Sequence, residues 1–258
     1  MILLDTVHIE NCLSTLKRVP ANYIDLILTS PPYDNLRRYN GYSFDFKAIA
    51  KELVRVLKKG GVIIWVVADQ TINGSESGAS FKQALYFKEL GLNLHDTMLY
   101  AKVNPIPLTH NRYEQAFEYM FCLSKGKPNT FNALTEETKA KGVYKKGKSK
   151  AKKESSYAVR HRETPELIIR KGYKIRPNIF YYRIGSGPKT IHTAPFPMEL
   201  ALDQIKTWTN EGDIVYDPFS GSGRTLAASC QLNRRFFGSE ISEIYEDDIL
   251  NLIAEQLL

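Results

Sequence analysis

Apolar residues along the chain form two recurring patterns, short continuous runs and longer stretches with a three- and four-residue spacing. The first pattern is typical of buried strands and the second of amphipathic helices. We expect strands over 3–9, 23–28, 61–69, 94–102, 117–124, 213–216 and 235–239. We expect helices over 12–17, 44–58, 79–90, 197–209, 224–232 and 242–257, with Gly60 and Gly61 ending the second helix. This alternation predicts an α/β fold with a doubly wound sheet.

The periodic pattern breaks between residues 125 and 190, where positive charge dominates. Residues 139–176 contain 14 Lys or Arg and three Glu, a net charge of +11, whereas the whole chain of 258 residues carries +7. Such a surface attracts phosphates, and the tyrosines between the cations favour nucleic acid over a merely solvated loop. We therefore divide the chain into 1–124, a basic insertion at 125–190, and 191–258.

Composition narrows the class of protein further. Apolar residues make up 43% of the chain, enough for a sizeable core. The three cysteines are too few and too far apart for a disulfide framework, and no Cys/His cluster suggests zinc. No run approaches the roughly 18 apolar residues of a membrane span. We expect a soluble cytoplasmic protein that does not contact a membrane.

The expected strand at 23–28 leads directly into Thr-Ser-Pro-Pro-Tyr, residues 29–33. Consecutive prolines make a rigid turn, and open α/β sheets bind ligands at such strand ends. Ser30 offers a hydroxyl acceptor, Pro31 a carbonyl acceptor and Tyr33 a flat ring. The turn suits a planar amine, although a proline-stiffened turn with a packing tyrosine would show the same residues.

A second motif follows the expected strand at 213–216. The sequence Asp-Pro-Phe-Ser-Gly-Ser-Gly-Arg-Thr, residues 217–225, opens into an apolar helix. Glycines let the backbone turn tightly and approach a ligand, and the helix offers free N–H groups. The loop is neither a complete dinucleotide fingerprint nor a phosphate loop. Glu240 ends the next strand, where an acid can accept hydrogen bonds from ribose hydroxyls or simply cap a helix.

Taken together, these residues resemble the amino-group DNA methyltransferases that use S-adenosylmethionine, the N4-cytosine and N6-adenine family. The catalytic turn precedes the donor loop with a basic insertion between them, an order that resembles the circularly permuted β group. The resemblance implies a Rossmann-like class I methyltransferase domain with a doubly wound mixed sheet, whose catalytic half is 1–124, whose inserted target-recognition region is 125–190 and whose donor-binding half is 191–258. It implies a catalytic turn formed by Ser30, Pro31, Pro32 and Tyr33. It also implies donor contacts from Asp217, Pro218, Phe219, Gly221, Gly223, Thr225, Glu240, Pro195 and Phe196.

Two positions depart from the family pattern. Members commonly show Gly-Asp after the first strand, whereas this chain has Glu10-Asn11, and Glu10 stays undecided. Arg224 stands where a small or hydroxyl residue is frequent in the family.

None of the three cysteines follows a proline, which argues against methylation at carbon 5 of cytosine.

The resemblance also implies partners and a reaction. We expect double-stranded DNA as substrate, a flipped target base, a bacterial or phage-infected cell, and a homodimer and a cognate restriction endonuclease as candidate partners. The serine in the turn favours cytosine N4 over adenine N6. An RNA amino-methyltransferase and a catalytically silent nucleic-acid-binding protein are the remaining alternatives.

Overall fold

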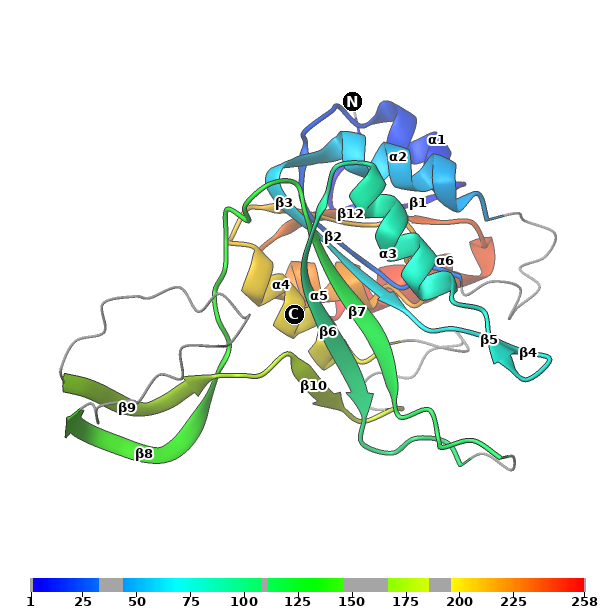
Figure 1. Cartoon of the computed structure of the whole chain (residues 1–258). Helices are drawn as coiled ribbons and strands as arrows, with labels where there is room; N and C mark the ends of the chain where they lie inside the picture. Colours follow the sequence, from blue (N-terminus) through cyan, green and yellow to red (C-terminus); the bar gives the residue numbers. More distant parts are fainter. Residues whose placement is uncertain (1, 33–43, 108–110, 146–166, 186–195, 258) are drawn as a thin grey trace. The chain divides into compact units, whose positions relative to one another are not determined.

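The computed structural model describes residues 2–32, 44–107, 111–145, 167–185 and 196–257. Its main feature is an eight-stranded sheet with the strand order β1-β12-β11-β2-β3-β7-β6-β10 (Figure 1). These strands are β1 (Thr6–Ile9), β2 (Ile24–Thr29), β3 (Leu57–Val67), β6 (Asn93–Lys102), β7 (Phe117–Ser124), β10 (Ile179–Tyr182), β11 (Ile214–Asp217) and β12 (Arg235–Glu240). The helices are α1 (Cys12–Arg18), α2 (Phe46–Val56), α3 (Ala79–Glu89), α4 (Met198–Trp208), α5 (Arg224–Gln231), the 3-10 turn η1 (Glu243–Tyr245) and α6 (Glu246–Ala254).

Within this sheet, β7 pairs antiparallel with both β3 and β6, while the other described neighbours pair in parallel. The predicted α/β fold with a mixed sheet is therefore confirmed. The carboxyl ends of β2, β11 and β12 meet at one edge, because these strands run in the same direction. This edge is where an open α/β sheet places its ligands.

Helices cover both faces of the central strands (Figure 1). On one face, α1, α2 and α3 bury side chains such as Leu53 and Phe87 against Trp65. On the other, α4, α5 and α6 bury side chains such as Leu200 and Ile249. Strands buried on both faces carry near-continuous apolar runs, which is why β2 and β3 are evident in the sequence.

The predicted end of the second helix is wrong. The helix α2 stops at Val56, and β3 begins at Leu57, which pairs with Ile24 of β2. The pairing of β2 with β3 is irregular at this point, and Gly60 lies in the irregular stretch with a φ of +78°. Gly60 therefore bends a strand and does not end a helix.

Four further strands form two hairpins that the periodicity did not predict, and β10 was not predicted either. One hairpin pairs β4 (Thr71–Ile72) with β5 (Ser75–Glu76), and the other pairs β8 (Thr135–Lys145) with β9 (Leu167–Ile175). Residues 133–176 form a compact unit of their own, and residues 1–132 with 177–258 form the other. Within the described ranges, no helix has the length and apolar character needed to cross a membrane.

Candidate active site at the carboxyl edge of the sheet

The two sequence motifs lie on neighbouring strands. β2 pairs with β11 through Leu26 with Val215 and Ile27 with Tyr216, so both strands end side by side. Ser30 and Pro31 directly follow β2, and Asp217 is the last residue of β11. The predicted catalytic turn and the glycine-rich loop, far apart in the sequence, thus leave the sheet at the same place. Tyr33 and Pro195 lie outside the described residues.

A direct hydrogen bond joins the two strand ends. Thr29 Oγ1 donates to Asp217 Oδ1 at 2.6 Å, and the backbone N–H of Phe219 donates to the same oxygen at 3.0 Å. Burial raises the pKa of Asp217 to about 6, and the hydrogen bonds from Thr29 and Thr225 oppose that rise. The carboxyl group of Asp217 therefore acts as a buried anchor for the loop, and this link was not apparent in the sequence.

The glycine-rich loop folds tightly against the neighbouring elements. Gly221 and Gly223 adopt φ values of +51° and +75°, in the left-handed region that favours glycine. A Cβ on Gly223 would approach Ile249 of α6 to 3.0 Å. The N–H of Ser220 donates to the carbonyl of Ser239 in β12 at 2.9 Å. These contacts hold the loop backbone at the carboxyl edge, where a ligand can lie against it.

Glu240 contacts the loop from the end of β12. Its Oε2 accepts from the Gly221 N–H at 2.8 Å, and its Oε1 accepts from the Ser242 N–H at 2.9 Å. The residue is 9% exposed, and burial raises the pKa of its carboxyl group. A carboxylate has about four acceptor positions, so these two bonds orient it and leave it able to accept ribose hydroxyls.

Phe219 packs in an aromatic cluster. Its ring centroid lies 5.6 Å from that of Phe44 and 6.5 Å from that of Trp65, both edge to face. Phe46 continues the cluster from α2, 6.0 Å from Trp65. The predicted donor residue Phe219 is thus also a packing residue that ties the loop to β3 and α2.

Phe196 and Thr225 complete the described part of the predicted donor set. The carbonyl of Phe196 accepts a hydrogen bond of 2.6 Å from Arg224 Nη1. The buried Thr225 Oγ1 donates to the carbonyl of Leu28 in β2 at 3.4 Å. Pro218 is buried within the loop. The structure therefore connects the segment before α4, the glycine-rich loop and β2.

Glu10 and Asn11, which precede α1, both have structural roles. Asn11 is the N-cap of α1, and its Oδ1 accepts from the Leu13 N–H at 2.9 Å. Glu10 accepts hydrogen bonds from Arg18 and, at 2.7 Å, from Thr15 Oγ1, and the bond from Arg18 lowers the pKa of Glu10. These contacts give Asn11 and Glu10 structural roles that need no bound substrate.

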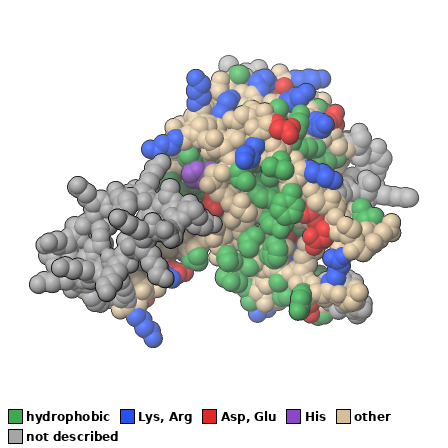
Figure 2. All heavy atoms as spheres, viewed as in Figure 1, with side chains coloured by type: hydrophobic (Ala, Val, Ile, Leu, Met, Phe, Trp, Pro, Cys, Tyr) green, Lys and Arg blue, Asp and Glu red, His purple; other side chains and the backbone are tan. Residues whose placement is uncertain are grey.

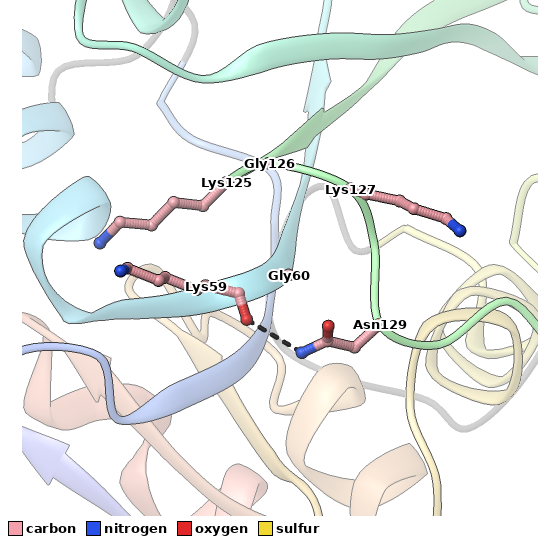
Figure 3. A pocket seen from close by; sticks show the side chains of 6 residues that line it. All are labelled: Lys59, Gly60, Lys125, Gly126, Lys127 and Asn129. Carbon is pink, nitrogen blue, oxygen red and sulfur yellow. Dashed lines mark hydrogen bonds between the residues drawn. The ribbon is translucent and has the colours of Figure 1, made fainter.

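A cationic hollow of about 440 Å³ lies at the opposite end of β3, lined by Lys59, Gly60, Lys125, Gly126, Lys127 and Asn129. In Figure 3, Lys59 and Lys125 extend the same way and Lys127 points elsewhere. Lys125 Nζ donates to the carbonyls of Val54 and Leu57 at 2.8 and 2.9 Å, which satisfies the last turn of α2. Lys125 therefore joins the residues after β7 to the end of α2, and the hollow lies at the edge of the sheet opposite to the carboxyl edge.

Comparison with known proteins agrees with this geometry. Residues 24–251 match the DNA methylase family N6_N4_Mtase. The chain is 50% identical over 234 residues to the orphan methyltransferase M.BamHII of Bacillus amyloliquefaciens, covering 87% of this chain and 86% of that protein.

Solved structures share the fold. PvuII DNA methyltransferase, described as cytosine-N4-specific, has a TM-score of 0.67 at 19% identity, covering 97% of this chain and 92% of that one. TTHA0409 of Thermus thermophilus, complexed with S-adenosyl-L-methionine, has a TM-score of 0.63 at 21% identity, covering 98% and 95%. The chain belongs to the N6/N4 family of DNA methylases, methyltransferases that take their methyl group from S-adenosylmethionine.

Proposed function

We propose that this protein transfers a methyl group from S-adenosylmethionine to N4 of a cytosine flipped out of duplex DNA. The observation that carries the proposal is the adjacency of Ser30 and Pro31, at the end of β2, to the loop that begins at Asp217. A base at the turn and a donor against the loop would meet at one edge of the sheet. The order of these motifs along the chain supports assignment to the permuted β group.

The residues of the loop fit the donor. Gly221 and Gly223 let the backbone approach it closely, and Glu240 presents a carboxylate, oriented by the loop itself, to ribose hydroxyls. When bound, S-adenosylmethionine supplies an electrophilic methyl group on a sulfonium. Asp217 is 1% exposed and supports the loop by accepting hydrogen bonds from Thr29 and from the Phe219 N–H.

The catalytic turn activates the acceptor amine. An exocyclic amine is a weak nucleophile because its lone pair is delocalised into the ring. Acceptance of its two hydrogens by Ser30 Oγ and the Pro31 carbonyl favours a pyramidal nitrogen whose lone pair points at the methyl group. As the N–C bond formed, the bond between the methyl carbon and the sulfur would break and leave S-adenosylhomocysteine, and the nitrogen would give up one proton to solvent. Tyr33 would stack on the flipped base.

The three cysteines do not support methylation of cytosine at carbon 5. Methylation at carbon 5 needs a thiolate nucleophile. Burial raises the pKa of Cys12 to about 12 and raises the pKa of Cys122 and of Cys230 as well. All three thiols therefore stay protonated near neutral pH, and an exocyclic amine is the favoured acceptor.

Adenine N6 is the second candidate, because the same two acceptors can hold its amine. Ser30 at the head of the turn supports cytosine. Nucleoside mass spectrometry on unmethylated duplex DNA, incubated with protein and S-adenosylmethionine, decides between them. We expect N4-methylcytosine. N6-methyladenine would overturn the choice of base, and no methylated nucleoside would overturn the proposed activity.

Variants of the turn test the base pocket separately. Replacing Pro31 or Tyr33 by Ala should abolish methyl transfer and leave S-adenosylhomocysteine binding largely intact, since neither residue belongs to the proposed donor set. An exposed residue of α2, Lys51, provides a control by Lys51→Ala. Retained activity in the Pro31 and Tyr33 variants would reject the pocket.

We also propose that the enzyme acts as an orphan methyltransferase, as the name of M.BamHII describes that relative, without an obligatory restriction endonuclease. Activity of the purified chain alone would support this, and a requirement for a second protein would contradict it.

The insertion at 125–190 is the proposed target-recognition region.

A homodimer is the proposed assembly. Figure 2 shows hydrophobic side chains gathered on the face that carries α3, β6 and β7. Phe81, Leu85 and Phe117 are 48%, 57% and 38% exposed there, and Phe81 and Phe117 both contact Tyr119. A contiguous exposed apolar cluster is typical of an interface. Sedimentation should give twice the monomer mass, and Leu85→Lys should shift the protein toward monomer.

A further inference from the structure

Arg224 is an unusual residue in this site. It is the first residue of α5 and is 5% exposed, and among the residues whose burial the structure describes no other Lys or Arg is buried. Burying a cation is costly unless nearby groups compensate for the lost hydration. Members of the family frequently have a small or hydroxyl residue at this position, so the sequence gave no reason for a charged side chain here.

The guanidinium joins two segments of the donor half. Arg224 Nη1 donates to the carbonyl of Phe196 at 2.6 Å, across 28 residues of sequence. Phe196 lies immediately before Pro197 and the start of α4, whereas Arg224 follows the glycine-rich loop. This bond ties the segment before α4 to the start of α5, in addition to the packing of the Phe196 side chain against the core.

The surroundings of Arg224 include one acid, Glu199, and keep the guanidinium charged. Burial lowers the pKa of Arg224, while Glu199 and Tyr100 raise it, and a guanidinium stays charged throughout. The N-terminus of α5 adds partial positive charge. Gly223, at the N-cap of α5, provides no side-chain acceptor for the helix N–H groups.

S-adenosylmethionine carries one anionic group, the carboxylate of its methionine part. Glu240 contacts the loop at Gly221, and Arg224 lies at the other end of the same loop. A donor whose ribose is held at Glu240 would therefore extend its amino-acid end along the loop toward Arg224. We propose that Arg224 is a positioning residue that selects for the donor carboxylate, through its charge and through its hold on Phe196. This inference rests on the donor site proposed above.

The test compares two ligands that differ in one group. S-adenosylhomocysteine has the carboxylate, and its decarboxylated form keeps the adenosine, the sulfur and the amine. Calorimetric titration of the full-length protein should give tighter binding of S-adenosylhomocysteine by about tenfold. Arg224→Gln, which keeps N–H donors but removes the charge, should bring this ratio close to one. Arg224→Lys should retain most of it.

Controls separate this inference from a general loss of structure. Arg234 donates to the carbonyls of Thr209 and Leu232 at 2.8 and 2.6 Å, so Arg234→Gln also removes a guanidinium bound to backbone and should keep the wild-type ratio. Glu240→Gln should weaken both ligands equally, because both contain ribose. If Glu240→Gln changes neither, the proposed donor site is wrong.

Two results would overturn the role of Arg224. One is an Arg224→Gln protein that weakens both ligands to the same extent or neither. The other is a wild-type ratio near one, which decides the matter even if the Gln variant does not fold. A KM for S-adenosylmethionine that rises in Arg224→Gln while the KM for DNA stays constant would add kinetic support.

Discussion

Thr29 Oγ1 donates a hydrogen bond of 2.6 Å to Asp217 Oδ1, although the two residues lie 188 positions apart. Both side chains are buried, at 0% and 1% exposure. Thr29 immediately precedes the proposed catalytic turn, and Asp217 begins the glycine-rich loop. The bond therefore fixes the distance between the proposed base pocket and the proposed donor loop, on which alignment of an amine with a methyl group depends.

Removing this bond should weaken both folding and catalysis. Thr29→Val keeps the shape of the side chain but leaves a buried carboxyl oxygen with one donor fewer, at a cost of about 1–3 kcal/mol. We expect a lower free energy of unfolding in urea and a lower kcat. Thr29→Ser keeps the hydroxyl and should restore most of both. Equal kcat values for the Val and Ser variants would show that the bond does not align the two pockets.

Asp217 should make stability depend on pH in an unusual direction. Its pKa is raised from 3.8 to about 6, so the folded protein holds this proton more tightly than the unfolded chain. The resulting stabilisation is complete below the unfolded pKa and is lost as pH rises through the folded pKa, a change on the order of 2–3 kcal/mol.

Comparison with Asp217→Asn isolates that titration. The amide does not titrate, and its oxygen can still accept from Thr29 and Phe219. The free energy of unfolding of the wild type, measured relative to the variant in urea, should therefore fall from about pH 4 to about pH 7. A difference that stays constant over this range would show that Asp217 has an ordinary pKa.

The sequence predicted those features that depend on local pattern. β2 and β3 are buried on both faces and carry continuous apolar runs, and both motifs follow strands, so their meeting at one edge could be expected. Hydrophobic pattern carries no information on strand direction, so the mixed sheet was expected only from the family resemblance, and nothing in the sequence identified β7 as the reversed strand. The burial of Arg224 and the bond from Thr29 arise from contacts between distant segments, which no single stretch of sequence displays.

Gly238 should be intolerant of any side chain. A Cβ at this position in β12 would lie 2.1 Å from Ser220 Oγ and 2.9 Å from Leu226 Cδ1. Gly238→Ala should therefore displace the glycine-rich loop, with a loss of about 1–3 kcal/mol in stability and weaker S-adenosylhomocysteine binding. Thermal unfolding and calorimetry measure the two effects.

A second substitution tests the cause. Ser220→Ala removes the oxygen that the new methyl group would strike, so the double variant Ser220→Ala/Gly238→Ala should recover part of the loss. The contact with Leu226 remains and limits the recovery. In a double-mutant cycle we expect a coupling of about 0.5–3 kcal/mol between the sites. Additive effects would mean that the clash with Ser220 is not responsible.

The basic insertion should supply the salt-dependent part of DNA binding. Replacing Lys148, Lys150, Lys152 and Lys153 by Gln removes four positive charges from the segment that carries +11. For every phosphate that is no longer neutralised, the slope of log affinity against log salt should become shallower by about 0.9. We expect a shallower slope and weaker binding to any duplex, measured by fluorescence anisotropy, with unchanged affinity for S-adenosylhomocysteine.

The matched control removes the same charge elsewhere. Lys17, Lys47, Lys51 and Lys88 are exposed on α1, α2 and α3, and their replacement by Gln changes the net charge equally. If the insertion contacts the DNA backbone, only the first set changes the salt slope, because released counterions come from phosphates that are actually neutralised. Equal slopes for the two variants would mean that total charge, and not the insertion, governs binding.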